Sequence, residues 1–491
     1  MWLTQLLERN RQCFPDRTAL VDERRSVTWA ELHDRTARIA QGLAGLGVQS
    51  GDRVAVLSLD RIEVLESYFA LARLGAVFVP VNHSLIASEV TGITERTGAS
   101  AVIGEAALLE RHPDLPVKLR IAFESEEFAE LADTPVNAAL PVVPDDAVAA
   151  ILHTSATTGQ AKGVTVDQGS FRAIALGWLA LAAPTDDMVM VNCCPLYHGS
   201  MVVSLTYMAA GATVVLMPGF KPQKALSLIE EHRATHVWLV PQMLRFMLQT
   251  KGLQSADLSS LREVLYGAAP MPLEVYKEAA ERLGCGFRHV YGMTEVGGPF
   301  VTLGPAEHPD LQGELPDQIP AGRVIPGMSA RVLDTDDTEL GPEAIGEVVV
   351  RGPGIMHGYW NDPAATAEVT VDGWIRTGDL GYLDRAGRIH LVDRRKDLII
   401  RAGQNVYPAE IERALRAHPK VLDAAVVGIP DADYGEVPLA YAVAVEGTQP
   451  AELMSHLAGQ LAPYKRPRRI ELIDEVPRNP AGKILKKLLR T

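Results

Sequence analysis

The run HTSATTGQAKGV at residues 153–164 combines hydroxyl side chains, glycines and a lysine in a pattern suited to holding a polyphosphate. It follows an apolar stretch, residues 147–152, that reads as a strand. The groups that would surround phosphate oxygens are backbone N–H groups, the Lys162 ammonium, and the loop residues Thr154, Ser155, Thr157, Thr158 and Gly159. The Walker pattern GxxxxGK[ST] is not met, since Gly163 follows Lys162, so an ordinary P-loop ATPase is disfavoured.

Five more segments with chemical potential follow in order: YGAAP (266–270), YGMTE (291–295), TGD (377–379), DRRKDLIIRAGQNVYPAEIE (393–412) and PRNPAGKILKKLLR (477–490). Together with the 153–164 loop, they resemble the signature motifs of the AMP-forming acyl-activating enzymes. That superfamily contains acyl-CoA synthetases, peptide-synthetase adenylation domains and luciferases. Because the matches run to residue 490, the resemblance covers most of the chain and is specific.

The resemblance implies roles for residues of the 153–164 loop and of the YGAAP and YGMTE segments. Tyr291 would stack on adenine, Thr294 would donate to the α-phosphate, and Glu295 would hold Mg²⁺, which prefers oxygen ligands. Lys162, Thr294 and Glu295 are therefore candidate catalytic residues. The backbone and small side chains around the nucleotide would come from Gly267, Ala268, Ala269, Pro270, Gly292 and Met293.

The remaining segments supply the ribose, the hinge and the catalytic cation in the same resemblance. Asp379 would accept both ribose hydroxyls, and Arg394 would contact ribose or phosphate. Lys396 stands where the family has its hinge, which needs only a backbone rotation, so a side-chain role is left open. Lys483 is the leading catalytic candidate, because an ammonium beside the α-phosphoryl group stabilises its growing negative charge. Gly403 would let pantetheine pass close to the backbone.

The acyl pocket is expected to include His198, Trp238, Gly267, His289 and Val290. His198, in CCPLYHGS, matches a family segment beside this pocket and is expected to shape it rather than to move a proton. Val290 occupies a position that is often glycine in members that take long acyl chains. A branched side chain there predicts a compact aromatic, cyclic or short acid.

The phosphate loop departs from the commonest family pattern at three positions. His153 stands where tyrosine is usual, Ala156 where glycine is usual, and Ala161 where proline is usual. A methyl group at residue 156 would crowd the phosphates if the backbone needs a positive φ, so a slower ATP half-reaction is a hypothesis.

The elements that position these residues alternate between helix and strand. Residues 28–46 begin with Thr28 and Glu31 in capping-box spacing and read as a helix, and residues 53–59, 62–74 and 77–81 read as strand, helix and strand. The pattern predicts an α/β fold with a large N-terminal domain of helix-covered sheets. Short strands past residue 340, with the resemblance, predict a distorted β-barrel-like region and then a small mobile α+β domain. The expected boundaries are 1–393, a hinge at 394–396, and 397–491.

Composition narrows the class of protein. The 491 residues carry 47 basic and 61 acidic side chains, a net charge of −14, which disfavours nucleic-acid binding by the overall field. The four cysteines lack metal-site spacing, and a reducing cytoplasm is expected. The apolar segment 201–218 is interrupted by polar residues, so it predicts a buried helix and strand rather than a membrane span.

The resemblance predicts an ATP-dependent carboxylic acid:CoA ligase that forms acyl-AMP and pyrophosphate and then a thioester. ATP, Mg²⁺ and coenzyme A are the expected cofactors, and a monomer or homodimer is expected. One alternative loads the phosphopantetheine of a separate carrier protein, for which the basic residues 465–469 would lie near the acceptor surface. A second activates an unusual acid without forming a thioester. A third, a catalytically silent nucleotide-binding protein, is disfavoured because Lys483, Glu295 and Asp379 are retained.

Overall fold

The structure, a computed structural model, describes residues 2–154, 161–197, 199–313, 315–316, 318–478 and 484–490. The chain divides into two compact units, Met1–Ser329 with Arg351–Ile375 and Ala330–Val350 with Arg376–Thr491. These units do not have the boundaries of the predicted domains, 1–393 and 397–491. The two domains and the hinge at 394–396 remain predictions. Seven positions discussed above lie outside the described residues: Ser155, Ala156, Thr157, Thr158, Gly159, His198 and Lys483.

A seven-stranded sheet forms part of the first unit. Its strands lie in the order β18 (Gly358–Tyr359), β8 (Gly163–Asp167), β7 (Val148–His153), β4 (Val77–Val81), β3 (Arg53–Leu57), β5 (Ala101–Gly104) and β6 (Leu119–Ala122). Strands β4, β3, β5 and β6 pair in parallel, whereas β8 runs antiparallel to β7 and β18. The helices near these strands in the chain are α2 (Trp29–Gly45), α3 (Ile62–Leu74), α4 (Ala87–Thr97), α5 (Ala106–Glu110), α6 (Glu126–Asp133) and α12 (Pro363–Val369).

A nine-stranded sheet forms the rest of the first unit. Its order is β15 (Arg323–Val324), β14 (Gly298–Leu303), β13 (Gly286–Met293), β12 (Glu263–Gly267), β11 (His236–Leu239), β9 (Val189–Asn192), β10 (Thr213–Leu216), β1 (Thr18–Val21) and β2 (Ser26–Thr28). The six strands from β13 to β1 pair in parallel. The associated helices are α1 (Trp2–Cys13), α7 (Gln168–Ala182), α8 (Ser200–Ala210), α9 (Pro222–Glu231), α10 (Pro241–Gln249) and α11 (Leu273–Leu283), with the short 3₁₀ helices η1 (Lys251–Gln254), η2 (Thr294–Val296) and η3 (Pro305–Glu307).

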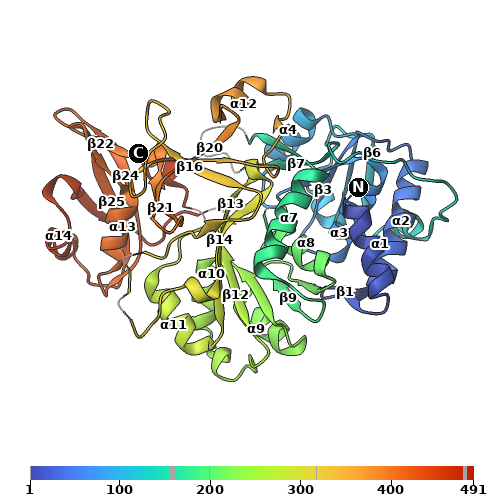
Figure 1. The fold of residues 1–491 in the computed structure, drawn as a ribbon, viewed down its shortest axis with the longest axis horizontal. Helices are drawn as coiled ribbons and strands as arrows, with labels where there is room; N and C mark the ends of the chain where they lie inside the picture. Colours follow the sequence, from blue (N-terminus) through green and yellow to red (C-terminus); the bar gives the residue numbers. More distant parts are fainter. Residues whose placement is uncertain are drawn as a thin grey trace. The chain divides into compact units, whose positions relative to one another are not determined.

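Helices cover both faces of this sheet. Figure 1 shows α9, α10 and α11 grouped together, and their apolar side chains pack with Leu239 and Tyr266 in one buried core. Helix α8 lies on the opposite face, where the Tyr207 ring centroid is 5.2 Å from that of His236. Successive residues of a strand point to opposite faces, so Trp238 shares the α8 face with His236.

The short strands predicted past residue 340 belong to a five-stranded sheet. Its order is β16 (Ser329–Leu333), β17 (Gly346–Arg351), β20 (Trp374–Leu383) and β19 (Thr370–Val371), with β21 (Ile389–Arg394) also paired to β20. Strand β20 runs antiparallel to both β19 and β21. A 3₁₀ helix, η4 (Arg395–Asp397), follows β21.

The C-terminal part of the second unit has the predicted α+β character. Its sheet has the order β23 (Gln404–Val406), β22 (Ile399–Arg401), β25 (Gly435–Ala444) and β24 (Val421–Asp431), and β26 (Arg469–Leu472) pairs with β25. The helices are α13 (Pro408–Arg416) and α14 (Pro450–Ala458), with η5 (Pro463–Lys465) and η6 (Lys486–Leu489). Ile411, Leu415, Val426 and Leu457 pack in one apolar core between helices and sheet.

Local signals explain several boundaries. Thr28 Oγ1 accepts a hydrogen bond from Glu31 N at 3.2 Å, and Thr28 N donates to Glu31 Oε2 at 2.7 Å, which is the predicted capping box at the start of α2. The apolar segment 201–218 forms α8 and β10, as predicted. Across the described ranges, none of the helices has both the length and the apolar character that crossing a membrane requires.

Candidate active site

A lysine, a tyrosine and a glutamate lie together in the first unit. The Lys162 ammonium nitrogen is 4.9 Å from the centroid of the Tyr359 ring, a cation–π distance. The Tyr359 hydroxyl donates a 2.8 Å hydrogen bond to Glu295 Oε1. Burial raises the pKa of Tyr359, and the negative charge of Glu295 raises it further, so the hydroxyl remains a donor. The cation and the carboxylate are thus held on either side of one aromatic side chain.

Strand pairing places Tyr359 beside Lys162. Strand β18 pairs with β8 so that Tyr359 lies opposite Val164. Trp360 N donates to Gly163 O at 2.7 Å, and Thr165 Oγ1 donates to Gly358 O at 2.7 Å. Tyr359 is not among the site residues predicted from sequence. The only local signal was an aromatic pair directly after Gly358.

The phosphate loop is described at its two ends. Thr154 N donates to Lys162 O at 3.1 Å, so the loop leaves β7 and enters β8 at neighbouring points. His153, the last residue of β7, has its pKa lowered to about 4 by burial, so its ring is neutral at physiological pH. Lys162 is partly exposed and lies 3.9 Å from Glu368. A backbone hydrogen bond therefore joins Thr154 and Lys162, two of the phosphate-binding candidates.

The YGMTE segment closes β13 and opens η2. The backbone of β14 lies so close to Gly292 that an added Cβ would come within 2.5 Å of Pro299 Cα. Only glycine fits this approach. Glu295 is then anchored through its own carbonyl, which accepts a 2.8 Å hydrogen bond from Met356 N. The Tyr291 ring lies 5.2 Å from the Phe300 ring, so it packs on one aromatic neighbour.

The YGAAP segment ends β12 with strained backbone. Ala268 has φ +63°, in the left-handed region that side chains other than glycine rarely adopt. Such strain is commonly found at functional sites and costs on the order of 1 kcal/mol or more. Ala269 and Pro270 follow it in a turn outside regular structure.

The predicted acyl-pocket residues divide between two faces of the sheet. A Cβ added to Gly267 would meet Val290 Cγ2 at 2.7 Å and Trp238 Cη2 at 3.1 Å, so these three residues lie together. His289 lies on the opposite face, with its ring 5.0 Å from that of Tyr266. The structure does not bring His289 together with Trp238, because neighbouring residues of a strand face opposite ways.

Contacts account for the position of His289. Its Nδ1 lies 2.9 Å from Ala321 O, and burial lowers its pKa to about 4. A neutral, fully buried ring bonded to a backbone carbonyl supports the packing behind the sheet rather than a charge-based role.

In the second unit, Asp379 and Arg394 are partners on adjacent strands. They lie opposite each other in the β20–β21 pairing, and Arg394 Nε is 3.1 Å from Asp379 Oδ1. Asp379 N donates to Thr377 Oγ1 at 3.1 Å, and that hydroxyl donates to Val348 O at 2.7 Å. The structure therefore brings together the two residues predicted to contact ribose.

The segment that carries Lys483 is anchored on both sides. Arg478 and Ile484 form an isolated β-bridge. Beyond it, Lys486 Nζ lies 2.8 Å from Glu412 Oε1, and the Tyr441 hydroxyl donates to Leu489 O at 2.9 Å. The chain thus enters and leaves the 479–483 stretch at one place on the second unit.

The hinge and acceptor candidates also belong to this unit. Lys396 is exposed within η4, next to Asp397, which pairs with Arg490 at 3.0 Å. Gly403 and Ala402 form the two-residue turn between β22 and β23, with φ of +78° and +49°.

Two family models match most of the chain. The model described as AMP-binding enzyme matches residues 7–360, and the model described as AMP-binding enzyme C-terminal domain matches residues 410–483. The chain belongs to the AMP-binding enzyme family. The first match spans Lys162, Glu295 and Tyr359, and the second ends at Lys483.

Relatives of this AMP-binding enzyme are similar over nearly their whole length. It is 39% identical over 503 residues to the fatty acid–[acyl-carrier-protein] ligase ScoC of Streptomyces coeruleorubidus, covering 99% of this chain and 96% of that protein. It is 37% identical over 476 residues to the feruloyl-CoA synthase of an Amycolatopsis species, covering 96% and 95% of the two chains.

Solved structures share the fold. ATP-bound MatB from Rhodopseudomonas palustris has a TM-score of 0.90 at 30% identity, covering 99% of this chain and 98% of that one. The amide bond synthetase McbA from Marinactinospora thermotolerans has a TM-score of 0.89 at 30% identity, covering 99% of each chain. The predicted α/β fold and the resemblance to AMP-forming acyl-activating enzymes are therefore confirmed. The AMP-binding enzyme is an AMP-forming acid–thiol ligase, and it depends on ATP.

The residues of the AMP-binding enzyme fit a magnesium ion bound together with a nucleotide. Among the described residues, no group of three or more His, Cys, Asp or Glu side chains is arranged to hold a metal. Mg²⁺ characteristically binds through one or two carboxylates and the phosphates of its substrate. Glu295, a carboxylate oriented by the Tyr359 hydroxyl, suits that mode.

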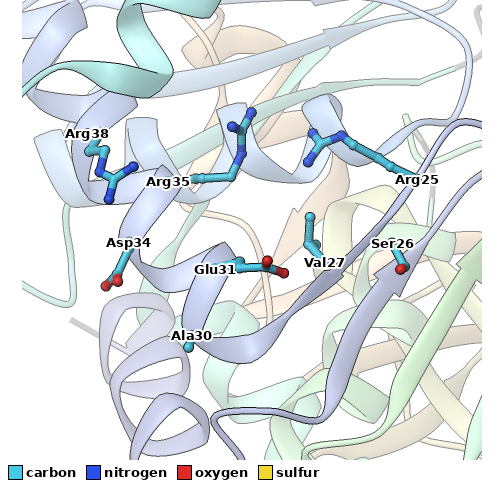
Figure 2. A pocket seen from close by; sticks show the side chains of 8 residues that line it. All are labelled: Arg25, Ser26, Val27, Ala30, Glu31, Asp34, Arg35 and Arg38. Atoms are coloured by element: carbon cyan, nitrogen blue, oxygen red, sulfur yellow. The ribbon is translucent and has the colours of Figure 1, made fainter.

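A pocket elsewhere on the first unit has a structural explanation. It has a volume of about 380 Å³ and is lined by residues of β2 and α2, including Arg25, Arg35 and Arg38 (Figure 2). Arg25 and Arg35 both pair with the buried Glu66, at 3.0 and 2.7 Å. These arginines tie the N-terminal elements to α3, and the pocket contains none of the predicted site residues.

Proposed function

We propose that the enzyme is a carboxylic acid:CoA ligase that activates a compact aryl, cyclic or short acid. The acid carboxylate attacks the α-phosphate of ATP in line, pyrophosphate leaves, and an acyl-adenylate forms. The thiol of coenzyme A then attacks the acyl carbon and AMP leaves. The observation that carries this proposal is the Lys162–Tyr359–Glu295 arrangement, which offers a phosphate-binding cation beside an oriented carboxylate.

Each residue has a role in the first half-reaction. Lys162, Thr154 and the hydroxyls of Ser155, Thr157 and Thr158 would bind the β- and γ-phosphates, and Thr294 would donate to the α-phosphate. Glu295 would hold Mg²⁺, which neutralises phosphate charge when bound. Asp379 would accept hydrogen bonds from the ribose. Its orientation by Arg394 and by Thr377 supports this role.

Lys483 completes the proposed first half-reaction, and the hinge leads to the second. We propose that Lys483 stabilises the charge that grows on the α-phosphoryl group, and that rotation at residues 394–396 then replaces it with the turn at Gly403. The exposure of Lys396 in a short 3₁₀ helix is compatible with such a rotation. We further propose that the reaction takes place in the cytoplasm, where ATP and coenzyme A are abundant.

The acid is inferred from the pocket wall. Val290 Cγ2 lies where a side chain on Gly267 would extend, next to the Trp238 ring, so the wall is filled by branched and aromatic groups. Such a wall suits a short or flat acid better than a long alkyl chain. The feruloyl-CoA synthase relative is named for an aryl acid, which favours the same reading.

A second acceptor is supported by the relative ScoC, whose name gives an acyl-carrier protein as acceptor. The alternative proposal is that phosphopantetheine on a separate carrier replaces coenzyme A. A second alternative, activation without a thioester, draws on the structural neighbour McbA, which is described as an amide bond synthetase.

Product analysis separates these proposals. Purified enzyme with MgATP is supplied in turn with benzoate, cinnamate, cyclohexanecarboxylate, propionate and palmitate, each with and without coenzyme A, and AMP, pyrophosphate and acyl-CoA are measured. We expect AMP together with acyl-CoA from at least one of the first four acids. A preference for palmitate would overturn the compact-acid proposal. Pyrophosphate release without acyl-CoA would favour a carrier protein or an amine as acceptor.

The Lys483→Ala variant tests the division of roles. We expect AMP formation from the free acid to fall by roughly a hundredfold or more, because the lost charge acts in the transition state. Conversion of a supplied acyl-adenylate to thioester should persist. The control is Lys487→Ala, an exposed lysine of the same segment. Equal loss of both half-reactions in Lys483→Ala would contradict the division.

A further inference from the structure

We propose that the acid carries a neutral hydrogen-bond acceptor, such as a ketone oxygen, remote from its carboxylate, and that Asn192, Ser204 and Trp238 recognise it. This inference rests on the proposed function and names the chemical class of acid that the same site selects.

Among the described residues, the buried polar groups without a hydrogen-bond partner include Asn192 Nδ2, Ser204 Oγ and Trp238 Nε1. Asn192 and Ser204 are fully buried, and Trp238 is 5% exposed. Buried donors without partners are unfavourable, and the great majority of buried polar groups in proteins are paired. Three such groups near one another indicate a ligand that supplies the missing acceptor.

Strand register places Asn192 and Trp238 side by side. Asn192 is opposite Trp238 in the parallel pairing of β9 with β11. Residues opposite each other on adjacent parallel strands project to the same face of the sheet. This face is the one covered by α8, since Trp238 shares it with His236.

Helix geometry brings Ser204 to the same level. Helix α8 connects the parallel strands β9 and β10, so it runs back from the carboxyl ends of the strands. Tyr207 contacts His236, and Ser204 lies one turn earlier on the same side of the helix. One helical turn back along α8 and two residues forward along β11 are similar distances in the same direction. Ser204 therefore faces the level of Trp238.

The donors adjoin the proposed acyl pocket. Trp238 Cη2 lies 3.1 Å from the position of a Cβ on Gly267, and Val290 Cγ2 lies 2.7 Å from it. The indole ring thus forms part of the wall of the pocket that Val290 narrows. An acid bound against this wall would present its far end to the indole N–H and its neighbours.

The surrounding charges are balanced, which favours a neutral acceptor. Arg288 is opposite Leu265, and Leu265 is opposite Trp238, so the three side chains share one face. Arg288 Nε is 2.6 Å from Glu263 Oε1, and the pair is almost fully buried. Burial lowers the pKa of His236 to about 4, so that ring is neutral as well. A second carboxylate or an ammonium on the acid would find no unpaired opposite charge among Arg288, Glu263 and His236.

Matched acids test the proposal. One pair is 4-oxocyclohexanecarboxylic acid and 4-methylenecyclohexanecarboxylic acid, and the other is 4-acetylbenzoic acid and 4-isopropenylbenzoic acid. Within each pair a ketone oxygen is replaced by a methylene group of similar shape. The measurement is kcat/KM for AMP release with MgATP. We expect the wild type to prefer the ketone by about tenfold or more in at least one pair, because the methylene leaves buried donors unpaired.

Variants assign the preference to the named residues. Ser204→Ala and Trp238→Phe should each reduce the ketone preference by about fivefold, mainly by lowering kcat/KM for the ketone. The matched control is Ser67→Ala, which removes another fully buried hydroxyl without a described partner, on α3. It should leave the preference unchanged. Thermal melting of each variant checks that it is folded.

The outcomes separate two failures. A preference below threefold in both pairs, or a preference that Ser204→Ala and Trp238→Phe leave intact, would overturn the inference. Activation of other acids but none of these four would overturn it as well. Release of no AMP from any carboxylic acid would instead contradict the proposed function, and the inference with it.

Discussion

The hydroxyl of Tyr359 donates to Glu295 Oε1 at 2.8 Å, while the ring of the same tyrosine lies 4.9 Å from the Lys162 ammonium. One side chain thereby spaces a cation from a carboxylate. If both charges were in direct contact, each would neutralise the other before a nucleotide arrived. In the roles proposed above, this spacing would leave the cation for phosphate and the carboxylate for a metal ion.

Tyr359→Phe removes the hydrogen bond and retains the ring. We expect the KM for MgATP to rise by roughly tenfold or more, because a lost hydrogen bond to a charged group is worth about 1.5 kcal/mol or more. Steady-state kinetics at several magnesium concentrations measures the effect. The control, Tyr382→Phe, keeps a ring that stacks on His390 in the other unit. An unchanged KM in Tyr359→Phe would remove this tyrosine from the site.

The burial of Asp60 should make the free energy of unfolding depend on pH. Its carboxyl is fully buried and accepts a 2.9 Å hydrogen bond from Leu196 N, and burial raises its pKa to about 7. The folded chain therefore holds the proton more tightly than the unfolded chain, so the free energy of unfolding should fall as pH rises from about 4 to 7. The full effect is at most about 4 kcal/mol.

Asp60→Asn removes this titration and keeps an acceptor for Leu196 N. Urea denaturation at pH 5 and pH 8 should show that the wild type loses more stability than the variant. Asp114→Asn, at an exposed carboxyl, should behave as the wild type does. The same pH dependence in Asp60→Asn and wild type would show that Asp60 is not the titrating group.

Gly292→Ala should destabilise the first unit by roughly 2 kcal/mol or more, because the new Cβ meets backbone of β14 at Pro299 and Gly298. A Cβ at Gly45, the last residue of α2, has no atom within 4 Å. Gly45→Ala should therefore stabilise the chain by about 0.5 kcal/mol. Denaturation midpoints compare the two variants, and similar shifts in both would refute the steric explanation.

The Lys486–Glu412 pair predicts a link between stability and adenylation. Both side chains are largely buried, at 14% and 8% exposed, and breaking such a pair on one side costs about 3–5 kcal/mol. Lys486→Met should destabilise the second unit and reduce AMP formation, because the segment that carries Lys483 loses an anchor. Lys487→Met, at an exposed neighbour, should do neither. A stable Lys486→Met variant with full activity would contradict the anchoring role.

Much of the fold follows from local sequence. Helix α3 and strand β4 begin and end at the predicted residues 62–74 and 77–81, because apolar periodicity and a glycine at residue 75 determine them locally. Helix α14 begins at Pro450 and ends at Ala458. The proline that opens it was a usable signal, whereas its end depends on packing.

The contacts within the candidate site could not be predicted as well from sequence. Tyr359 reaches Lys162 through a pairing of β18 with β8 across nearly 200 residues, and no local pattern predicts that pairing. His289 and Val290 were assigned to one pocket because they adjoin a recognised motif. Their opposite orientations depend on the strand that contains both, which the motif did not reveal.

The most direct test of acyl-adenylate formation uses an acid labelled with ¹⁸O in its carboxyl group. The enzyme is incubated with MgATP, coenzyme A and the best labelled acid of the panel, and the products are analysed by mass spectrometry. Attack of the carboxylate on the α-phosphate predicts that one ¹⁸O atom appears in AMP, with unlabelled pyrophosphate. Label in inorganic phosphate accompanied by ADP would contradict the account, because the carboxylate would then have attacked the terminal phosphate.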